Sequence, residues 1–214
     1  MDLLRSLVDF IMHIDVHLSD IVTQYHGWVY GIVFLIIFVE TGLVIMPFLP
    51  GDSLLFASGA LATMNGGINI WIAIPVFFAA AVLGDSLNYE IGRKVGKSIP
   101  ENSFLGRFVN KERMQKAQDF FDKHGGKTIV IARFMPVVRT FIPFIAGASK
   151  MRYSHFITYN ITGALLWVLV GVFSGYFFGN IPFVRDHFSA VTLGIVVVSI
   201  LPAIIGLIRT KFKK

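Results

Sequence analysis

The sequence predicts an all-α polytopic membrane protein, and three features of its composition and patterning support this. Hydrophobic residues make up 55% of the 214 residues, charged residues make up 15%, and the mean hydropathy is +0.69, outside the usual range of soluble domains. The apolar residues gather in runs that are long enough, or nearly so, to cross a hydrocarbon core of about 30 Å. Lysine and arginine gather in a few segments between these runs. The apolar runs cover residues 28–46, 68–84, 156–178 and 188–208.

The positions of the basic residues predict which segments face the cytosol. Nine of the 19 Lys and Arg residues lie between residues 93 and 127, and four more lie in the C-terminal "RTKFKK". Segments rich in Lys and Arg stay on the cytosolic side, so helices at 153–179 and 188–208 would run out of the cytosol and back into it. The net charge of +6 follows from this bias, and no nucleic-acid partner is needed to explain it.

A broken hydrophobic segment follows the first long run, in "ETGLVIMPFLPGDSLLFASGA" at residues 40–60. Residues 53–64 would form a helix of only about 18 Å, which is too short to cross. We therefore expect a re-entrant hairpin over residues 28–64, with "PFLPGD" at its tip. Backbone groups that are freed at the tip have to be buried in protein or line a wet cavity, and Asp52 lies at this tip.

The same design recurs in the second half of the chain, where "KTIVIARFMPVVRTFIPFIAGASK" is broken by Pro136 and Pro143. Each half is predicted to hold a surface helix, a re-entrant hairpin and a full crossing. The surface helices are expected at 1–25 and 107–124, the hairpins at 28–64 and 127–150, and the crossings at 68–92 and 153–179. The first crossing ends in the cytosol and the second begins there, so the predicted repeats are inverted. Such repeats with Pro-interrupted segments indicate a transporter site near the bilayer midplane.

We expect one membrane domain over residues 1–214, with no further domain. It consists of a first repeat at 1–92, a second repeat with its cytosolic surface helix at 93–179, and a C-terminal transmembrane helix with a basic tail at 180–214. The surface helix at 1–25 is predicted from apolar residues at helical spacing on one face and polar residues on the other, a pattern typical of helices that lie in the membrane interface.

Four charged residues lie on the two predicted hairpins: Glu40 and Asp52 on the first, Arg133 and Arg139 on the second. An unpaired charge at the bilayer centre costs at least about 2.5–3.5 kcal/mol, so these residues need each other or a polar ligand. One interpretation is that they form ion pairs that hold the fold. The other is that the arginines bind an anionic head group through their bidentate fork, while the acids carry protons. Arg139 is expected at the hairpin tip and Arg133 on the entering arm.

Further residues are weaker candidates for the same cavity. Asp85, Asn88 and Tyr89 lie in "GDSLNYEIGRKVG" near the cytosolic end of a crossing, and Asn160 and Trp167 lie on the crossing that follows the second hairpin. Pro50 and Pro136 are expected to line the cavity because they break the backbone at the two tips. Glycines at 171, 175 and 179 repeat the G-x-x-x-G spacing, which favours close helix packing over ligand binding.

Several classes of site are disfavoured. The segment "GRKVGKS" is one residue short of a P-loop and does not follow a strand, so ATP binding is not predicted. The sequence holds neither H-E-x-x-H nor G-x-S-x-G, which argues against an intramembrane enzyme. Cysteine is absent, which excludes a disulfide framework and a thiolate metal site. No metal or cofactor is expected.

Four long segments resemble the DedA family of bacterial membrane proteins: "ETGLVIMPFLPGDSLLF", "GDSLNYEIGR", "HGGKTIVIARFMPVVRTFIPFIAG" and "YNITGALLW". The resemblance covers nearly the whole chain. It implies a relation to eukaryotic VTT-domain proteins, which scramble phospholipids, and to bacterial members implicated in returning undecaprenyl phosphate across the inner membrane, with a link to the proton motive force. Residues treated as functional in the family fall, by motif, on Glu40, Asp52, Arg133 and Arg139.

The leading functional expectation is therefore a multi-pass protein of the bacterial inner membrane that moves a lipid phosphate, with undecaprenyl phosphate as the first candidate. Its partners would be membrane lipids and protons. Two alternatives stay open, a general phospholipid scramblase and a proton- or cation-coupled transporter of small solutes. The sequence also leaves the oligomeric state open, a homo-oligomer included.

Overall fold

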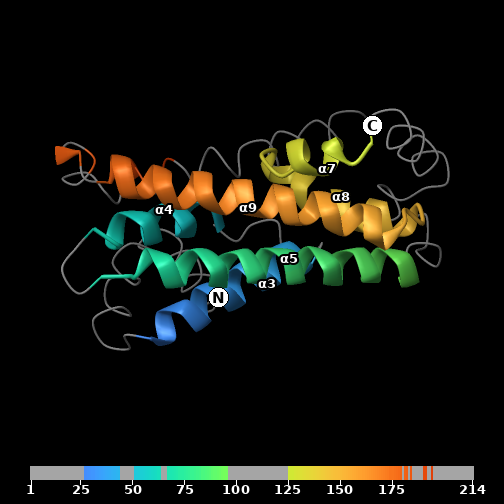
Figure 1. The fold of residues 1–214 in the computed structure, drawn as a ribbon, viewed down its shortest axis with the longest axis horizontal. Coiled ribbons are helices and arrows are strands. Elements are labelled where there is room, and N and C mark those ends of the chain that lie inside the picture. Colours follow the sequence, from blue (N-terminus) through green and yellow to red (C-terminus); the bar gives the residue numbers. More distant parts are fainter. Residues whose placement is uncertain are drawn as a thin grey trace, which may run out of the picture. The chain divides into compact units, whose positions relative to one another are not determined.

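The structure, a computed structural model, describes residues 27–43, 51–63, 67–95 and 125–179, together with the isolated positions 181–182, 184, 190–191 and 194. The regular structure of these residues is entirely helical, which confirms the all-α prediction (Figure 1). The helices are α3 (Trp28–Gly42), α4 (Gly51–Leu61), α5 (Ile70–Val95), α7 (Lys127–Ala132), α8 (Pro136–Ala148) and α9 (Tyr153–Phe178).

Two of these helices are long and apolar enough to cross a membrane. α5 and α9 each have 26 residues, with mean hydropathies of 2.0 and 1.9 over their most apolar windows. At 1.5 Å per residue each is about 39 Å long, which exceeds the hydrocarbon core of a bilayer. They correspond to the crossings expected at 68–92 and 153–179. α3 has 15 residues and α8 has 13, so neither crosses as a straight helix.

The second broken segment is interrupted at Met135, as the proline pattern predicts. A residue that precedes proline is sterically pushed out of the helical region, and Met135 is extended, with φ −107° and ψ 104°. α7 therefore ends at Ala132, and α8 begins with Pro136 at a position where its missing N–H costs nothing. Arg133 lies at this break and Arg139 lies one turn into α8, so the expected placement of Arg139 at the tip and Arg133 on the arm was wrong.

Pro143 does not break the segment, contrary to the sequence prediction. α8 continues through it to Ala148. Proline inside a helix removes one hydrogen bond and crowds the preceding turn, and packing around it has to offset this cost. Pro143 is buried, and the next residue, Phe144, is 1% exposed. This packing against neighbouring helices offsets the cost of the missing bond.

The first broken segment is described only on either side of its break. α3 ends at Gly42 and α4 begins at Gly51, while the prolines at 47 and 50 lie outside the described residues. Asp52 lies in the first turn of α4, not in a tip loop, and is half-buried. The expected surface helices at 1–25 and 107–124 also lie outside the described residues, as does nearly all of the expected C-terminal crossing at 188–208. The inverted arrangement of the two halves stays a prediction.

The chain divides into two compact units, and each is described by itself. The first unit comprises residues 1–37, 48–79 and 168–214. In it α4 packs on the end of α9 through a row of glycines: a Cβ at Gly171 would lie 2.8 Å from the Leu55 Cβ, and one at Gly175 would overlap the Phe56 carbonyl. The G-x-x-x-G spacing therefore serves close helix packing, as predicted. Tyr30 adds a contact between α3 and the start of α5, because its hydroxyl accepts a 2.7 Å bond from the Asn69 N–H.

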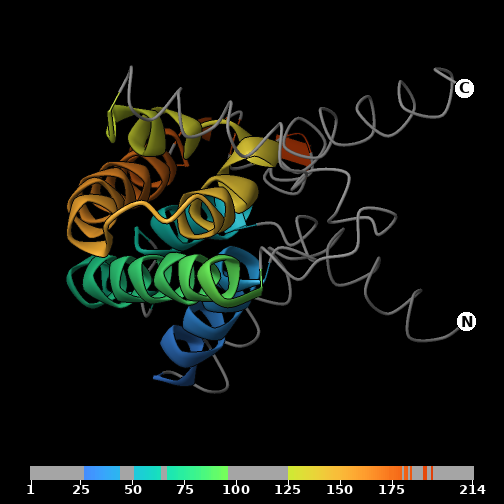
Figure 2. The same cartoon turned by 90° about the vertical axis from the view of Figure 1, so that its right-hand side faces the viewer.

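The second unit comprises residues 38–47 and 80–167, and it contains the candidate site. Its core is built on stacked aromatic rings, with Tyr89 and Phe156 centroids 4.6 Å apart, next to Ile129 and Ala146. The end of α5 lies alongside α8 (Figure 2). A Cβ at Gly147 would overlap the Tyr89 carbonyl, so glycine is what lets these two backbones touch.

Candidate functional site

Arg133 is the centre of a buried polar cluster in the second unit. Its side chain is 6% exposed, and its Nη1 donates to Asp85 Oδ2 in an ion pair and to Asn160 Oδ1 at 2.9 Å. Asn160 in turn donates from Nδ2 to the Val82 carbonyl at 3.2 Å. The arginine stem also passes Gly163 of α9, where a Cβ would lie 3.5 Å from the Arg133 Cδ, an ordinary contact distance. Arg133 is thus held by α5 on one side and α9 on the other.

Arg139 belongs to a second buried ion pair, in which its Nη2 donates to Glu40 Oε1. The Glu40 side chain is 1% exposed and that of Arg139 is 9% exposed. The pair joins α3 to α8, that is, the first broken segment to the second. Both charges are removed from water, which is favourable only when the partners stay together.

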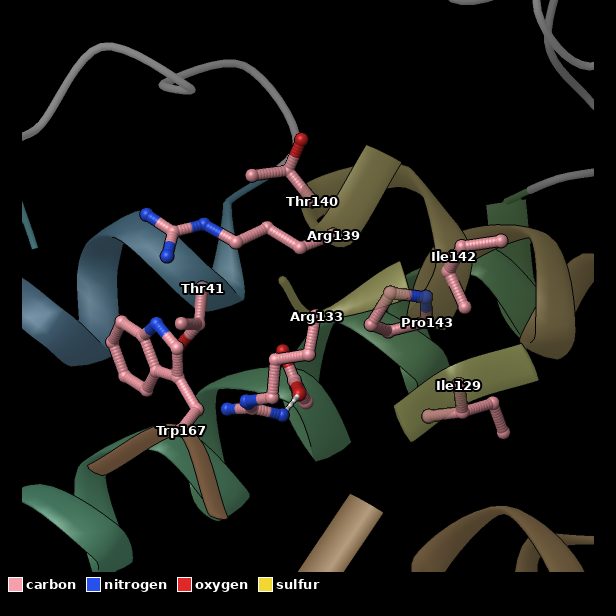
Figure 3. Close-up of a pocket in the computed structure, with 9 residues that line it drawn as sticks. Thr41, Ile129, Arg133, Arg139, Thr140, Ile142, Pro143 and Trp167 are labelled. Carbon is pink, nitrogen blue, oxygen red and sulfur yellow. Dashed lines mark hydrogen bonds and ion pairs between the residues drawn. The ribbon is translucent and has the colours of Figure 1, made fainter. Parts of the chain in front are cut away.

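Trp167 connects the two arginines. The Arg133 Cζ lies 5.4 Å and the Arg139 Cζ lies 5.1 Å from the centroid of the indole ring, within the range of cation–π attraction. Figure 3 shows both guanidinium groups beside this ring, while Ile129, Ile142 and Pro143 lie on the other side of the cavity. Trp167 therefore holds two positive groups near one another without neutralising either.

One edge of the Arg133 guanidinium has no hydrogen-bond partner among the described residues. Its Nε and Nη2 are buried and make no hydrogen bond to any residue that the structure describes. These two nitrogens form one side of the guanidinium fork, the side that binds two oxygens of a carboxylate or phosphate in parallel. A buried donor without an acceptor costs about 1–3 kcal/mol. The site therefore keeps a buried pair of parallel donors without an acceptor among the described residues, at an energetic cost.

The cavity at this site is small. It has a volume of about 10 Å³, which is about the space that one water needs. Its polar lining comes from both ion pairs and from two threonines, and the rest of the lining is apolar. The lining residues are Thr41, Asp85, Ile129, Arg133, Arg139, Thr140, Ile142, Pro143 and Trp167. A phosphate group does not fit into this volume.

A larger apolar groove of about 360 Å³ lies against α7 and α8. Ile142 lines both this groove and the small cavity, so its side chain separates the two. The groove has one charged lining residue, Lys127, which is exposed at the start of α7. The remaining described lining residues are Thr128, Ile131, Ala132, Met135 and Val138.

Most of the residues that the sequence proposed for the site lie in the second unit and come together there. Glu40, Arg133, Arg139 and Asp85 form the two ion pairs, and Asn160 and Trp167 contact the arginines. Asp85, which the sequence indicated only as a weaker candidate, is the ion-pair partner of Arg133. No residue spacing could have shown this, because 48 residues separate the two.

Three proposed residues are not placed at the site. Asp52 belongs to the first unit, so its expected pairing with an arginine or a polar ligand stays a prediction. Pro50 lies outside the described residues, and only the backbone of Pro136 is described. Asn88, a weaker candidate from the sequence, donates to the Thr41 and Thr140 carbonyls next to the Glu40–Arg139 pair. Among the side chains that the structure describes, no group of three His, Asp or Glu residues comes together as a metal site would require.

Comparison with known proteins identifies the family. The profile of the VTT domain matches residues 49–177, and Protein DedA of Escherichia coli is 51% identical over 212 residues, which cover 99% of this chain and 96% of that protein. This chain belongs to the DedA family of VTT-domain proteins. The resemblance seen in the four sequence segments is thereby confirmed over nearly the full length.

Other relatives of the DedA family agree on a membrane location. An uncharacterized membrane protein of Mycobacterium leprae is 48% identical over 80% of this chain and 76% of its own length. The inner membrane protein YghB of Escherichia coli is 36% identical over 86% of this chain and 83% of its own length. No solved structure matches this DedA-family chain. The chain is thus an integral protein of the bacterial inner membrane, as expected.

Proposed function

We propose that this protein carries a lipid phosphate across the inner membrane, and that undecaprenyl phosphate is the lipid. The observation that carries the proposal is the buried, unpartnered Nε and Nη2 edge of Arg133. A guanidinium edge of this kind matches two oxygens of a phosphate. Asp85 and Asn160 occupy the other end of the same group, so they orient the fork without using it.

The charges at the site favour an anion that arrives together with a proton. Glu40, Asp85, Arg133 and Arg139 sum to zero, because two carboxylates face two guanidinium groups. An anionic head group brings at least one negative charge into a site where uncompensated charge is expensive. A proton on Glu40 would restore neutrality and release Arg139 to bind the phosphate next to Arg133. The proposal therefore links transport to the proton motive force.

In the proposal, the arginine site and the groove take the two parts of such a lipid. The cavity is too small for a phosphate group, so the Glu40–Arg139 pair has to open before a head group enters. The groove along α7 and α8 is apolar and is separated from the cavity by Ile142. In this proposal the hydrocarbon chain lies in the groove, the phosphate reaches Arg133 past Ile142, and Lys127 attracts the head group at the cytosolic end.

A general phospholipid scramblase is the second candidate, because an arginine fork binds any phosphate head group and the family includes VTT-domain proteins. A transporter of small solutes is a third, and the apolar groove beside the site disfavours it. None of these functions requires covalent chemistry, and we propose no enzymatic activity.

Reconstituted liposomes distinguish these candidates. The purified protein would be inserted into vesicles that contain labelled undecaprenyl phosphate or labelled phosphatidylethanolamine, and the rate of appearance of each lipid in the opposite leaflet would be measured. The proposal predicts protein-dependent movement of undecaprenyl phosphate that far exceeds that of phosphatidylethanolamine and that responds to a pH gradient. Equal movement of both lipids would identify a scramblase, and movement of neither would contradict the proposal.

A further inference from the structure

Asn88 lies at the centre of a row of residues on α5. The backbones of two other helices, α3 and α8, pack closely against this row. Gly84, Asn88 and Gly92 are four residues apart, so they share one helix face. A Cβ at Gly84 would lie 2.9 Å from the Phe38 carbonyl oxygen of α3, and one at Gly92 would lie 2.8 Å from the Phe144 carbonyl carbon of α8. The two small residues bring α3 and α8 to either side of Asn88.

The Asn88 amide joins these two helices by hydrogen bonds. Its Nδ2 donates to the Thr41 carbonyl at 2.9 Å and to the Thr140 carbonyl at 2.8 Å, and the side chain is fully buried. Thr41 follows Glu40 in the sequence and Thr140 follows Arg139. One nitrogen therefore holds the two backbones at the residues next to the ion pair between α3 and α8.

The chemistry of this bridge is specific to an amide. An amide nitrogen carries two N–H donors at a fixed angle, whereas a carboxylate has none, a hydroxyl has one and an aliphatic side chain has none. Asn88 Oδ1 is buried and makes no hydrogen bond to any residue that the structure describes. The side chain thus serves as a double donor, and its acceptor is left unused at a cost.

We propose that Asn88 is a positioning residue of the site, which fixes Glu40 opposite Arg139 by holding the backbones of α3 and α8 at one separation. Asn88 itself touches neither charged group in this role. The register of the ion pair then depends on the two amide bonds, and any opening of the pair that separates α3 from α8 must break at least one of them. The inference rests on the proposed function for its transport readout, but its structural readout is independent of any lipid.

The test uses the absence of cysteine from the chain. Cysteines placed at Leu43 and Lys150, both exposed and just beyond the ends of α3 and α8, would carry spin labels for a distance distribution in liposomes. Asn88→Leu removes both donors at similar volume. Ser86→Ala is the matched control, because the bonds that it removes, to the Val82 carbonyl at 2.7 Å and from the Tyr153 hydroxyl of α9 at 3.2 Å, involve neither α3 nor α8.

We expect a single narrow distance distribution in the wild type and in Ser86→Ala, and a broadened or shifted one in Asn88→Leu. Undecaprenyl phosphate transport should fall about tenfold or more in Asn88→Leu, because both buried hydrogen bonds of Asn88 are lost, and should stay near normal in Ser86→Ala. An unchanged distance distribution in Asn88→Leu overturns the inference, whatever the transport rate. A changed distribution in a protein whose wild type moves no lipid supports the inference and contradicts the proposed function alone.

A second variant decides the case in which Asn88→Leu does not fold. Asn88→Gln keeps both donors on a side chain that is one methylene longer, so it should fold and should shift the distance between the labels. Restored thermal stability together with a shifted distribution supports the positioning role. Restored stability with a wild-type distribution shows that Asn88 serves packing alone and overturns the inference.

Discussion

Substitution of Arg133 by lysine separates phosphate binding from charge balance. In the structure Arg133 Nη1 bonds to Asp85 and Asn160, while Nε and Nη2 have no partner among the described residues. A lysine ammonium can replace Nη1 in the ion pair with Asp85, because it keeps the charge and three donors. It cannot replace the planar edge made by Nε and Nη2.

The magnitude follows from the number of bonds lost. A phosphate on the free edge of Arg133 would accept two parallel charge-assisted bonds, and lysine would retain at most one of them. A hydrogen bond to a charged group contributes about 1.5–3 kcal/mol, so the affinity for a lipid phosphate should fall roughly ten- to over a hundredfold. The stability of the protein should change much less, because Asp85 keeps a cationic partner.

Arg133→Ala should lower both the stability of the protein and its affinity for the lipid phosphate. Removal of the side chain leaves the Asp85 carboxylate, which is 4% exposed, buried without its cation. Breaking a buried pair in this way costs about 3–5 kcal/mol, so the thermal unfolding midpoint should fall together with binding. The comparison of the two variants therefore distinguishes loss of the fork from loss of the ion pair.

The assay is equilibrium binding of undecaprenyl phosphate to protein in lipid nanodiscs, with thermal unfolding measured on the same samples. Arg93→Lys is the matched control, because Arg93 is exposed and pairs with Glu90 at 3.5 Å on the surface of α5, where an ion pair contributes little. The reasoning predicts weakened binding in Arg133→Lys and unchanged binding in Arg93→Lys. Wild-type affinity in Arg133→Lys would refute the assignment of the fork.

Three further predictions concern the acids, the tryptophan and the helix contact. Glu40→Gln and Asp52→Asn should each reduce lipid transport while the protein still inserts and folds, because each removes an acid proposed to carry the proton; wild-type transport in both between pH 6 and pH 9 would remove proton coupling. Trp167→Phe keeps a ring but weakens its attraction for both guanidinium groups, so lipid phosphate affinity should fall severalfold in the binding assay, and an unchanged affinity would contradict a role for the indole. Gly147→Ala should lower the free energy of unfolding by about 1–3 kcal/mol, because the added methyl overlaps the Tyr89 carbonyl; equal thermal stability would show that α5 and α8 adapt.

Local sterics explain which parts of the fold could be predicted from the sequence. Met135 had to leave the helix because Pro136 follows it, and the glycines of α9 had to lie at a helix contact because of their spacing. Pro143 follows the same local rule for a break, yet α8 continues through it. The packing that holds this turn comes from residues distant in sequence, so the local pattern could not show it.

The site was only partly predictable for a similar reason. Hydrophobic context alone marked Glu40, Arg133 and Arg139 as charges that need partners. The partners of Arg133 depend on the rotation of α5 and α9 about their axes, because this rotation places Asp85 and Asn160 next to Arg133. Which of the two arginines is free to bind a phosphate depends on which guanidinium edge is already occupied. The sequence contains no signal for that.

The central claim is that the arginine site recognises the phosphate of a membrane lipid. Its most direct test is transport in proteoliposomes of two lipids that share one chain, undecaprenyl phosphate and undecaprenol, by the wild type and by Arg133→Lys. The account predicts that the wild type moves the phosphate and not the alcohol, and that Arg133→Lys moves neither. Equal transport of the phosphate and the alcohol, or undiminished phosphate transport by Arg133→Lys, would contradict it.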